Sequence, residues 1–480
     1  MEPLCGRTYE KKILLNHLHA REARLIAIYG RRRVGKTFLI RSVYKDTLVF
    51  ECSGIHGASL KQQLQNFSLA LQKAQGSSLP LAVPEDWLSA FQMLEQFLDQ
   101  RNAPHPSVVF FDELPWLHGP RSGFLPAFGH FWNTWASRQS QLVVIICGSA
   151  ASWMIKHIIN NKGGLHQRIN ERIRLEPFTL AETEAYLTQN NVSLDRYQLL
   201  QLYMAIGGIP PYLQAVRPGE SAAQAIDRIC FTKNGLLTEE FTNLYQSLFD
   251  EASHHMAIVR ELAKHGSGLN RNEIMNACRL SSGGTTSSLL DELTESGFID
   301  KQVPYEKNNK DSIYKLSDEY SLFYLKFIDK RKNTGDETWL RISETPSGRS
   351  WAGYAFEAVC LKHIKPLKKA LGIDGILTTE AIWRFVPGQE HPGAQIDLLI
   401  DRTDHSINIC EIKYTCDIFA IDAAYATELR RKLSVFREKT KTKKTLFLTM
   451  ITTYGVHNNT NATGLVQKQL TMDDLFQENT

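Results

Sequence analysis

The stretch Gly30-Arg-Arg-Arg-Val-Gly35-Lys36-Thr37 decides the fold of the N-terminal part of this chain. It fits the phosphate-loop (P-loop) pattern GxxxxGK[ST], with an apolar run at 25–29 before it and an amphipathic run at 38–44 after it. The first run predicts a buried strand and the second a helix. The backbone N–H groups of such a loop and the N-terminus of the following helix bind phosphate. The stretch therefore predicts a nucleotide-binding α/β domain.

The side chains of the loop have separate predicted roles. Lys36 would neutralise charge on the β- and γ-phosphates of ATP, and the Thr37 hydroxyl would be a ligand of Mg²⁺. The full set that we expect to contact ATP from this segment is Gly30, Arg31, Arg32, Arg33, Val34, Gly35, Lys36, Thr37 and Phe38.

An acidic motif follows a second predicted strand. The apolar residues 108–111 end in Asp112 and Glu113. Asp112 can hold the Mg²⁺ water shell beside ATP, and Glu113 can polarise the water that attacks the γ-phosphate. Acidic residues after a strand also serve as helix caps, which is the structural alternative. A third apolar run, 142–147, leads to Ser149, which either senses the γ-phosphate or is a turn residue.

Length and composition indicate a multidomain protein. The chain has 480 residues, 43% of them hydrophobic, which suits about three or four domains. We expect a P-loop core (1–177), a helical lid (178–249), a winged helix-turn-helix (250–335) and a further α/β domain (345–480), with a polar linker at 330–337. Without a membrane-spanning run or a signal-peptide pattern, a cytoplasmic location is expected. The eight cysteines form no CxxC pair, so they predict neither zinc nor disulfides.

Two segments bear on a nucleic-acid partner. The net charge of +4 is too small to predict one, but the segment 430–444 carries eight positive charges and one negative charge. That segment is either a solvated helix face or a surface that binds phosphates. The predicted recognition helix of the winged helix, near 285–293, has hydroxyl side chains but no arginine or lysine. DNA binding and protein contact are therefore both open for this module.

The last predicted domain contains a second candidate site. Two strand-like segments flank a turn at 402–405, and a hairpin would bring Asp397, Glu411 and Lys413 together. Glu411 and Lys413 are two residues apart and share a face of their strand. Two carboxylates can hold Mg²⁺, and the lysine can position or activate water. Glu357, on a predicted amphipathic helix, is a candidate third carboxylate. The alternative is an ordinary Glu/Lys pair on a surface strand.

This arrangement resembles the PD-(D/E)XK nuclease family. The resemblance implies that Asp397 and Glu411 ligate a metal ion and that Lys413 is the catalytic lysine. Ile396 stands where many members have a proline before the first aspartate.

Taken whole, the chain resembles the archaeal-type ATPase family, P-loop ATPases related to AAA+ and STAND proteins with a C-terminal nuclease-like domain. The motifs that carry the resemblance are Gly6-Arg-Thr-Tyr-Glu10, the loop at 29–37, Phe111-Asp-Glu113 and Gly207-Gly-Ile-Pro210. The resemblance implies that Arg7 lies near the adenine, and that Arg168 or Arg172 contacts the phosphates.

The expected protein is thus an α/β ATPase with a restriction-endonuclease-like C-terminal domain. The protein would bind and hydrolyse ATP and act on DNA, and ATP hydrolysis would control a Mg²⁺-dependent nuclease-like site. One alternative is a STAND-like switch whose C-terminal domain binds nucleic acid or protein without cleavage. Another is a homo-oligomeric machine that remodels proteins.

Overall fold

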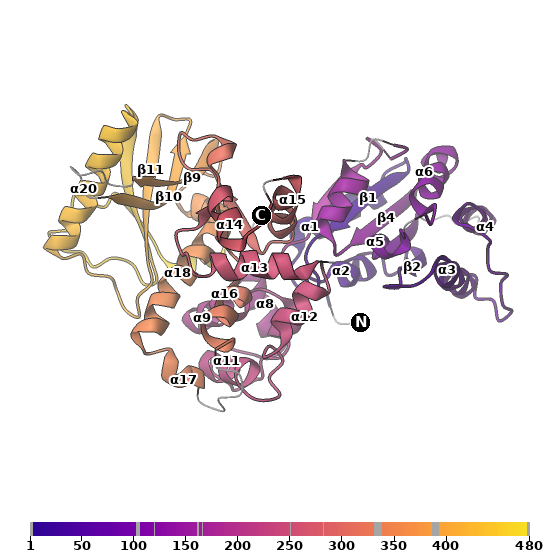
Figure 1. The fold of residues 1–480 in the computed structure, drawn as a ribbon, viewed down its shortest axis with the longest axis horizontal. Coiled ribbons are helices and arrows are strands. Elements are labelled where there is room, and N and C mark those ends of the chain that lie inside the picture. The colour runs from indigo at the N-terminus through magenta and orange to yellow at the C-terminus, as the bar shows by residue number, and fades with distance from the viewer. Residues whose placement is uncertain are drawn as a thin grey trace. The chain divides into compact units, whose positions relative to one another are not determined.

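Five parallel strands form the sheet in the N-terminal part of the computed structural model, in the order β2-β3-β4-β1-β5 (Figure 1). They are β1 (Arg24–Tyr29), β2 (Leu48–Ser53), β3 (Ser107–Asp112), β4 (Leu142–Gly148) and β5 (Glu171–Arg174). Every residue of β4 is buried, as expected for a central strand of a parallel sheet with both faces covered. The predicted parallel α/β architecture is confirmed here.

The chain divides into two compact units, one up to Pro177 and one from Phe178 onward. The structure describes residues 3–101, 106–119, 121–160, 163–165, 167–249, 251–281, 283–330, 338–385 and 393–477. The expected linker at 330–337 lies outside these residues except for Lys330, and the finer division of the second unit into three domains stays a prediction.

Helices of the first unit pack on its sheet through an aromatic core. They are α1 (Thr8–Leu18), α2 (Lys36–Val43), α3 (Leu60–Gln75), α4 (Trp87–Gln100), α5 (Leu114–Leu117), α6 (Phe124–Thr134) and α7 (Ala151–Met154). Phe111 of β3 contacts Phe91 of α4 and Phe128 of α6, with ring centroids 5.8 and 5.7 Å apart. This packing fixes the carboxyl end of β3, where the acidic motif begins.

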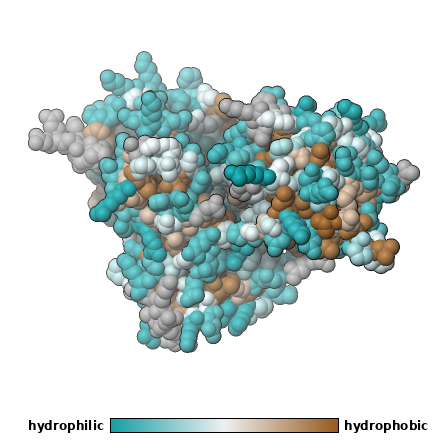
Figure 2. Space-filling model, turned by 45° about the vertical axis from the view of Figure 1, so that its right-hand side comes forward, coloured by the Kyte–Doolittle hydropathy of each residue, from teal (hydrophilic) through white to brown (hydrophobic). Residues whose placement is uncertain are grey.

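Several exposed large apolar side chains of the first unit lie on or near α3 and α4. Leu69 of α3 is 58% exposed, and Leu79, in the connection to α4, is 74% exposed. Figure 2 shows brown side chains exposed on this part of the surface among hydrophilic ones.

The second unit begins with helices. They are α8 (Leu180–Gln189), α9 (Arg196–Ile206), α10 (Pro210–Leu213), α11 (Ala222–Cys230) and α12 (Glu240–Gln246). Thr179 caps α8 through a capping box with Glu182. Gly208 precedes α10, and a Cβ atom there would lie 2.0 Å from the carbonyl oxygen of Phe178. The glycine at position 208, within the Gly207–Pro210 motif, is therefore required by the close approach of two backbone segments.

A three-stranded sheet of order β6-β8-β7 follows, with three helices. The elements are α13 (Ala252–Leu262), β6 (Leu269–Asn270), α14 (Arg271–Cys278), α15 (Gly284–Glu295), β7 (Ile299–Gln302) and β8 (Ile313–Leu316). The predicted succession of three helices and a hairpin is present. On α15, Thr286 is buried and donates to the carbonyl oxygen of Ser281 at 2.8 Å, so its hydroxyl is engaged inside the protein.

The C-terminal sheet has the order β13-β12-β11-β10-β9. Its strands are β9 (Thr378–Phe385), β10 (Ala394–Arg402), β11 (Ser406–Lys413), β12 (Thr445–Thr452) and β13 (Lys468–Leu470). Strands β9 to β11 pair antiparallel, and β11 to β13 pair parallel. The β10–β11 hairpin confirms the predicted pairing. Helix α20 (Ala423–Thr440) lies along this sheet, where its Phe436 contacts Trp383, with ring centroids 5.1 Å apart (Figure 1).

Buried polar contacts join the remaining helices to the unit. These helices are α16 (Glu319–Phe323), a π-helical turn η4 (Tyr324–Ile328), α17 (Thr338–Ile342), α18 (Pro346–Lys362) and α19 (Ile364–Ala370). His363 Nε2 accepts a hydrogen bond from the backbone N–H of Leu180 at 3.0 Å. Its Nδ1 lies 2.8 Å from the carbonyl oxygen of Val359, so the ring is neutral with the proton on Nδ1. No helix in the described part of the chain could cross a membrane.

Candidate functional site

The C-terminal hairpin brings Asp397, Glu411 and Lys413 together. Asp397 lies on β10 and the other two on β11, with Leu398 opposite Cys410 in the antiparallel register. The backbone N–H of Ile412 donates to Asp397 Oδ2 at 3.2 Å, and Lys413 Nζ lies 2.9 Å from Glu411 Oε1. The predicted grouping of these three side chains is therefore present in the structure, and their chemical roles stay predictions.

Two further side chains of this site were missed from the sequence. Lys432 Nζ lies 3.0 Å from Glu411 Oε1 and 2.8 Å from Oε2, and the Tyr425 hydroxyl donates to Oε1 at 2.8 Å. Both residues lie on α20, seven positions apart, which places them on one face of the helix. The seven-residue spacing of Tyr425 and Lys432 was the sequence signal that could have placed both side chains on the same face of α20. Lys432 is thus tied to a carboxylate rather than projecting freely as part of the basic segment.

The two carboxylates of the site differ in their electrostatics. Burial, followed by the charges of Glu411 and Glu357, raises the pKa of Asp397 to about 7. Burial also disfavours the Glu411 carboxylate, but Lys413 and Lys432 outweigh that effect and lower the pKa of Glu411. When the surroundings push the pKa values of two neighbouring carboxyl groups apart, one group can carry a proton while the other stays ionised. Asp397 is thus the group of this site that titrates near neutral pH.

The expected third carboxylate is engaged elsewhere. Glu357 of α18 accepts from Lys315 Nζ of β8 at 3.1 Å. In the ranges that the structure describes, no three His, Cys, Asp or Glu side chains form a group that could hold a metal ion. The expected ligand set of Glu357, Asp397 and Glu411 is therefore not gathered into one group, and lysines contact two of its three members. Asp397 and Glu411 alone still fit Mg²⁺, which commonly uses one or two carboxylates and keeps several waters.

The P-loop joins β1 to α2. Gly30 has φ +143°, and a Cβ atom there would lie 2.2 Å from the carbonyl oxygen of Leu175. Gly35 has φ +93° and is the N-cap of α2. Lys36 is buried, and its Nζ donates to the carbonyl oxygens of Gly30 and Arg31 at 2.9 and 3.0 Å. The lysine side chain therefore lies along the loop, as a phosphate-binding ammonium requires.

Thr37, at the start of α2, contacts Asp112, at the end of β3. The Thr37 hydroxyl donates to Asp112 Oδ2 at 2.8 Å, and Asp112 is buried at the end of β3. The other carboxylate oxygen of Asp112 accepts from the backbone N–H of Glu113 at 2.9 Å. A hydroxyl beside a buried carboxylate at the end of the loop is a donor set that fits Mg²⁺ together with nucleotide phosphates.

Glu113 faces the end of the neighbouring strand. Its Oε2 accepts from Ser149 twice, from the backbone N–H at 3.1 Å and from the hydroxyl at 2.8 Å. Glu113 has φ +46°, in the left-handed region, at the N-cap of α5. Such backbone strain in a non-glycine residue often marks a functional position. The structure thus brings the predicted base and the predicted sensor into direct contact.

The arginines proposed for this region have diverse surroundings. Arg7 is buried, and its Nη2 donates to the carbonyl oxygens of Val34 at 3.1 Å and Glu176 at 2.7 Å. Arg31 is buried, Arg32 is half-buried and Arg33 is exposed with φ +70°, while Phe38 is 37% exposed. Arg168 and Arg172 are both exposed, Arg172 on β5. The choice between them as the phosphate contact therefore stays open.

The loop and the acidic motif lie within a region that matches a known protein family. Residues 5–216 match the family described as an ATPase domain predominantly from Archaea. The chain carries an archaeal-type ATPase domain. This ATPase domain extends beyond Pro177 through α8, α9 and α10, so it includes the first helices of the second unit.

The ATPase domain and the rest of the chain have relatives among known proteins. The uncharacterized protein MJECL04 of Methanocaldococcus jannaschii is 24% identical over 413 residues, which is 85% of this chain and 87% of that protein. Among solved structures, the Walker-type ATPase PABY2304 of Pyrococcus abyssi is 18% identical, with a TM-score of 0.48 over 67% of this chain and 96% of that chain. The ORC2 protein of Aeropyrum pernix is 17% identical, with a TM-score of 0.39 over 68% of this chain and 94% of that chain.

Proposed function

We propose that the ATPase domain hydrolyses ATP at the P-loop and that this reaction controls a C-terminal site that acts on DNA. The observation that carries the ATPase part is the pair of contacts at the carboxyl ends of β3 and β4, Thr37 with Asp112 and Glu113 with Ser149. Asp112 ends the buried strand β3 and Glu113 follows it directly, so the positions of both carboxylates are fixed before a nucleotide arrives.

In this proposal each residue of the ATPase domain has one task. Lys36 binds the β- and γ-phosphate oxygens of ATP, and Glu113 accepts a proton from the attacking water. Ser149 holds the Glu113 carboxylate in place through its two hydrogen bonds. Mg²⁺, held by Thr37 and Asp112, would neutralise charge on the transferred phosphoryl group. Asp112 keeps the Thr37 hydroxyl oriented through their hydrogen bond.

Lys36→Ala tests the nucleotide site. We expect it to reduce ATP affinity by about a hundredfold, because a charged hydrogen-bond donor to phosphate is removed. Isothermal titration calorimetry with ATP and Mg²⁺ measures this change. Lys45→Ala, at an exposed lysine beyond the end of α2, is the matched control and should bind as the wild type does. Undiminished ATP binding by Lys36→Ala would refute the site.

For the C-terminal domain we propose Mg²⁺-dependent cleavage of DNA phosphodiesters, supported by the grouping of Asp397, Glu411 and Lys413. Asp397→Ala should abolish divalent-ion binding and cleavage, whereas Lys413→Ala should abolish cleavage and largely spare ion binding. Both variants should retain ATP hydrolysis. Plasmid nicking with Mg²⁺ or Mn²⁺ and calorimetry with Mn²⁺ provide the two readouts.

A second candidate function is a switch whose C-terminal domain binds a nucleic acid without cutting it. The ion pairs favour it, because Lys432 contacts both oxygens of Glu411 and Lys315 holds Glu357. DNA binding by the full chain without cleavage in Mg²⁺ or Mn²⁺ would select this candidate.

The basic helix α20 supports a nucleic-acid partner in either case. Arg431 and Lys439 are paired with neighbouring glutamates, whereas Arg430 and Arg437 are exposed on the same helix. We expect the double variant Arg430→Gln, Arg437→Gln to weaken DNA binding. The slope of log affinity against log salt concentration should fall by the amount expected for the loss of about two phosphate contacts. Fluorescence anisotropy over a range of salt concentrations measures the slope. An unchanged slope would leave α20 as a solvated face.

A further inference from the structure

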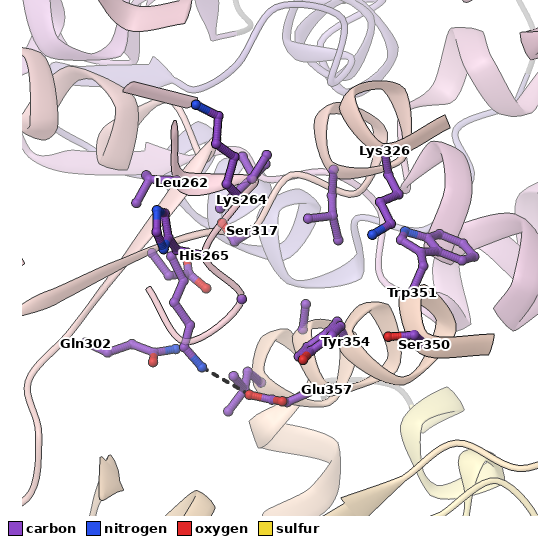
Figure 3. Close-up of a pocket in the computed structure, with 18 residues that line it drawn as sticks. Leu262, Lys264, His265, Gln302, Ser317, Lys326, Ser350, Trp351, Tyr354 and Glu357 are labelled. Carbon is purple, nitrogen blue, oxygen red and sulfur yellow. Dashed lines mark hydrogen bonds and ion pairs between the residues drawn. The ribbon is translucent and has the colours of Figure 1, made fainter. Parts of the chain in front are cut away.

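A pocket of about 340 Å³ lies within the second unit, and its lining does not include Asp397 or Glu411. Its walls come from the end of α13, from β7 and β8, from η4 and from α18 (Figure 3). The volume falls in the range of roughly 300–1,000 Å³ that is typical of small-molecule sites. Nothing in the proposed function uses this pocket.

One side of the pocket presents two hydrogen-bond donors without an acceptor. Trp351 is 5% exposed, and its indole Nε1 is buried without a hydrogen-bond partner among the described residues. Its ring packs on Phe327, at 5.6 Å between centroids, next in sequence to Lys326. Figure 3 shows the Lys326 side chain extending toward the Trp351 indole. Both groups can only donate, so an acceptor must come from elsewhere.

Two other lysines of the lining are compensated. Lys315 is paired with Glu357 at 3.1 Å and Lys264 with Glu261 at 2.6 Å. Lys326 and Asp300 have no ion pair with any residue that the structure describes, and Lys326 is the cation of the two and lies beside Trp351. An ammonium and an indole N–H together select an oxyanion, because charge-assisted hydrogen bonds are the strongest that such donors make.

The opposite side of the pocket contains a buried hydrogen-bond acceptor that lacks a donor among the described residues. The side-chain oxygen of Gln302 on β7 is buried and has no partner in the described part of the chain. In Figure 3, Gln302 lies across the pocket from Lys326 and Trp351. Tyr354 of α18 lines the pocket and is 56% exposed. An aromatic ring of this kind accepts a stacked planar group.

From these three features we propose that the pocket binds a nucleoside monophosphate. Its phosphate accepts hydrogen bonds from Lys326 and the Trp351 indole, its base stacks on Tyr354, and an amino group of the base donates to Gln302. Glu357 also lines the pocket while it neutralises Lys315, so an occupant contacts the carboxylate that the sequence had suggested for the C-terminal metal site. The pocket and its ligand do not depend on nucleotide binding by the P-loop.

Calorimetric titration of the full chain with 5′-AMP tests the proposal. Lys326→Met removes the charge at an exposed position, and Trp351→Phe keeps an aromatic ring but removes the N–H. Each should weaken 5′-AMP binding by about tenfold or more. Lys307→Met, at an exposed lysine outside the lining, should leave the affinity within about twofold. Thermal unfolding of each variant shows whether it is folded. If Trp351→Phe does not fold, Lys326→Met still decides the test.

The controls separate this pocket from the P-loop. Lys36→Ala should retain 5′-AMP binding while it loses ATP binding. If 5′-AMP binding is lost in Lys36→Ala and kept in Lys326→Met, the ligand sits at the P-loop and the proposal is wrong. Absence of 5′-AMP binding at millimolar concentration would also overturn it. Equal affinity for inorganic phosphate, or binding of a single-stranded oligonucleotide in place of the mononucleotide, would refute the assigned ligand class.

Discussion

The Glu113 carboxylate accepts two hydrogen bonds from Ser149, one from the backbone N–H at 3.1 Å and one from the hydroxyl at 2.8 Å. The two residues follow the neighbouring strands β3 and β4, so the carboxylate is oriented by the adjacent strand rather than by its own loop. Any displacement at the end of β4 therefore changes the direction of the proposed catalytic base.

Glu113→Gln should retain ATP binding and lose turnover. The glutamine oxygen can still accept from Ser149, so the local structure is kept, but the amide cannot take a proton from water. We expect hydrolysis to fall by about a hundredfold or more, the usual contribution of a general base. Phosphate release and ATP titration measure the two properties. Glu85→Gln, at an exposed glutamate of the same unit, is the control, and normal turnover by Glu113→Gln would exclude this residue as the base.

Gly30→Ala should destabilise the first unit far more than Gly57→Ala. Both glycines have positive φ, +143° and +70°, but only the Cβ atom at position 30 would meet a backbone atom, at 2.2 Å, whereas position 57 is open. We expect a cost of about 1 kcal/mol at Gly57 and about 3 kcal/mol or more at Gly30. Chemical denaturation of the variants tests this difference. Equal losses would mean that φ alone, and not the approach to Leu175, limits the position.

Asp397→Asn should remove a pH dependence from the stability of the second unit. Burial holds the pKa of Asp397 at about 7, against 3.8 for the ordinary side chain, so between these values the folded state binds more protons than the unfolded state. Stability therefore falls as the pH rises through this window. Between pH 5.5 and 8 we expect wild type to lose roughly 2 kcal/mol that Asp397→Asn does not lose. Unfolding midpoints at both pH values measure this, with exposed Asp374→Asn as control. Parallel pH profiles for wild type and Asp397→Asn would contradict the assignment.

Lys432→Met should strengthen divalent-ion binding at the C-terminal site. The ammonium of Lys432 contacts both oxygens of Glu411 and competes with a metal ion for them. Its removal should raise Mn²⁺ affinity about tenfold, since a partly buried ion pair no longer has to be broken. Lys439→Met, which removes an exposed lysine of the same helix, should have no effect. Weaker Mn²⁺ binding by Lys432→Met would show that the lysine supports the site rather than competing in it.

Local patterns predicted the elements and the side chains that one hairpin or one loop brings together. The apolar runs became β1, β3 and β4 because a strand buried on both faces has no polar alternation. The pairing of Asp397 with Glu411 followed because a short turn leaves only one hairpin register that buries the isoleucines.

Contacts between elements distant in the sequence could not be predicted in the same way. Lys432 reaches Glu411 only because α20 packs on the sheet with one particular rotation about its axis. Lys315 reaches Glu357 from β8 across 42 positions of sequence. A single sequence gives the charge of each lysine but not which carboxylate it contacts, so these two ion pairs could not be predicted.

The close approach of Gly30 to Leu175 has a practical consequence for observing the protein. The amide N–H of Leu175 donates to the carbonyl oxygen of Tyr29 at 2.8 Å, immediately before the loop, and Arg7 holds the next carbonyl, that of Glu176, at 2.7 Å. Hydrogen exchange at the Leu175 amide is therefore a natural reporter of loop occupancy that needs no attached probe. A ligand that stabilises the loop should slow this exchange, even though Leu175 itself belongs to the last residues before Phe178.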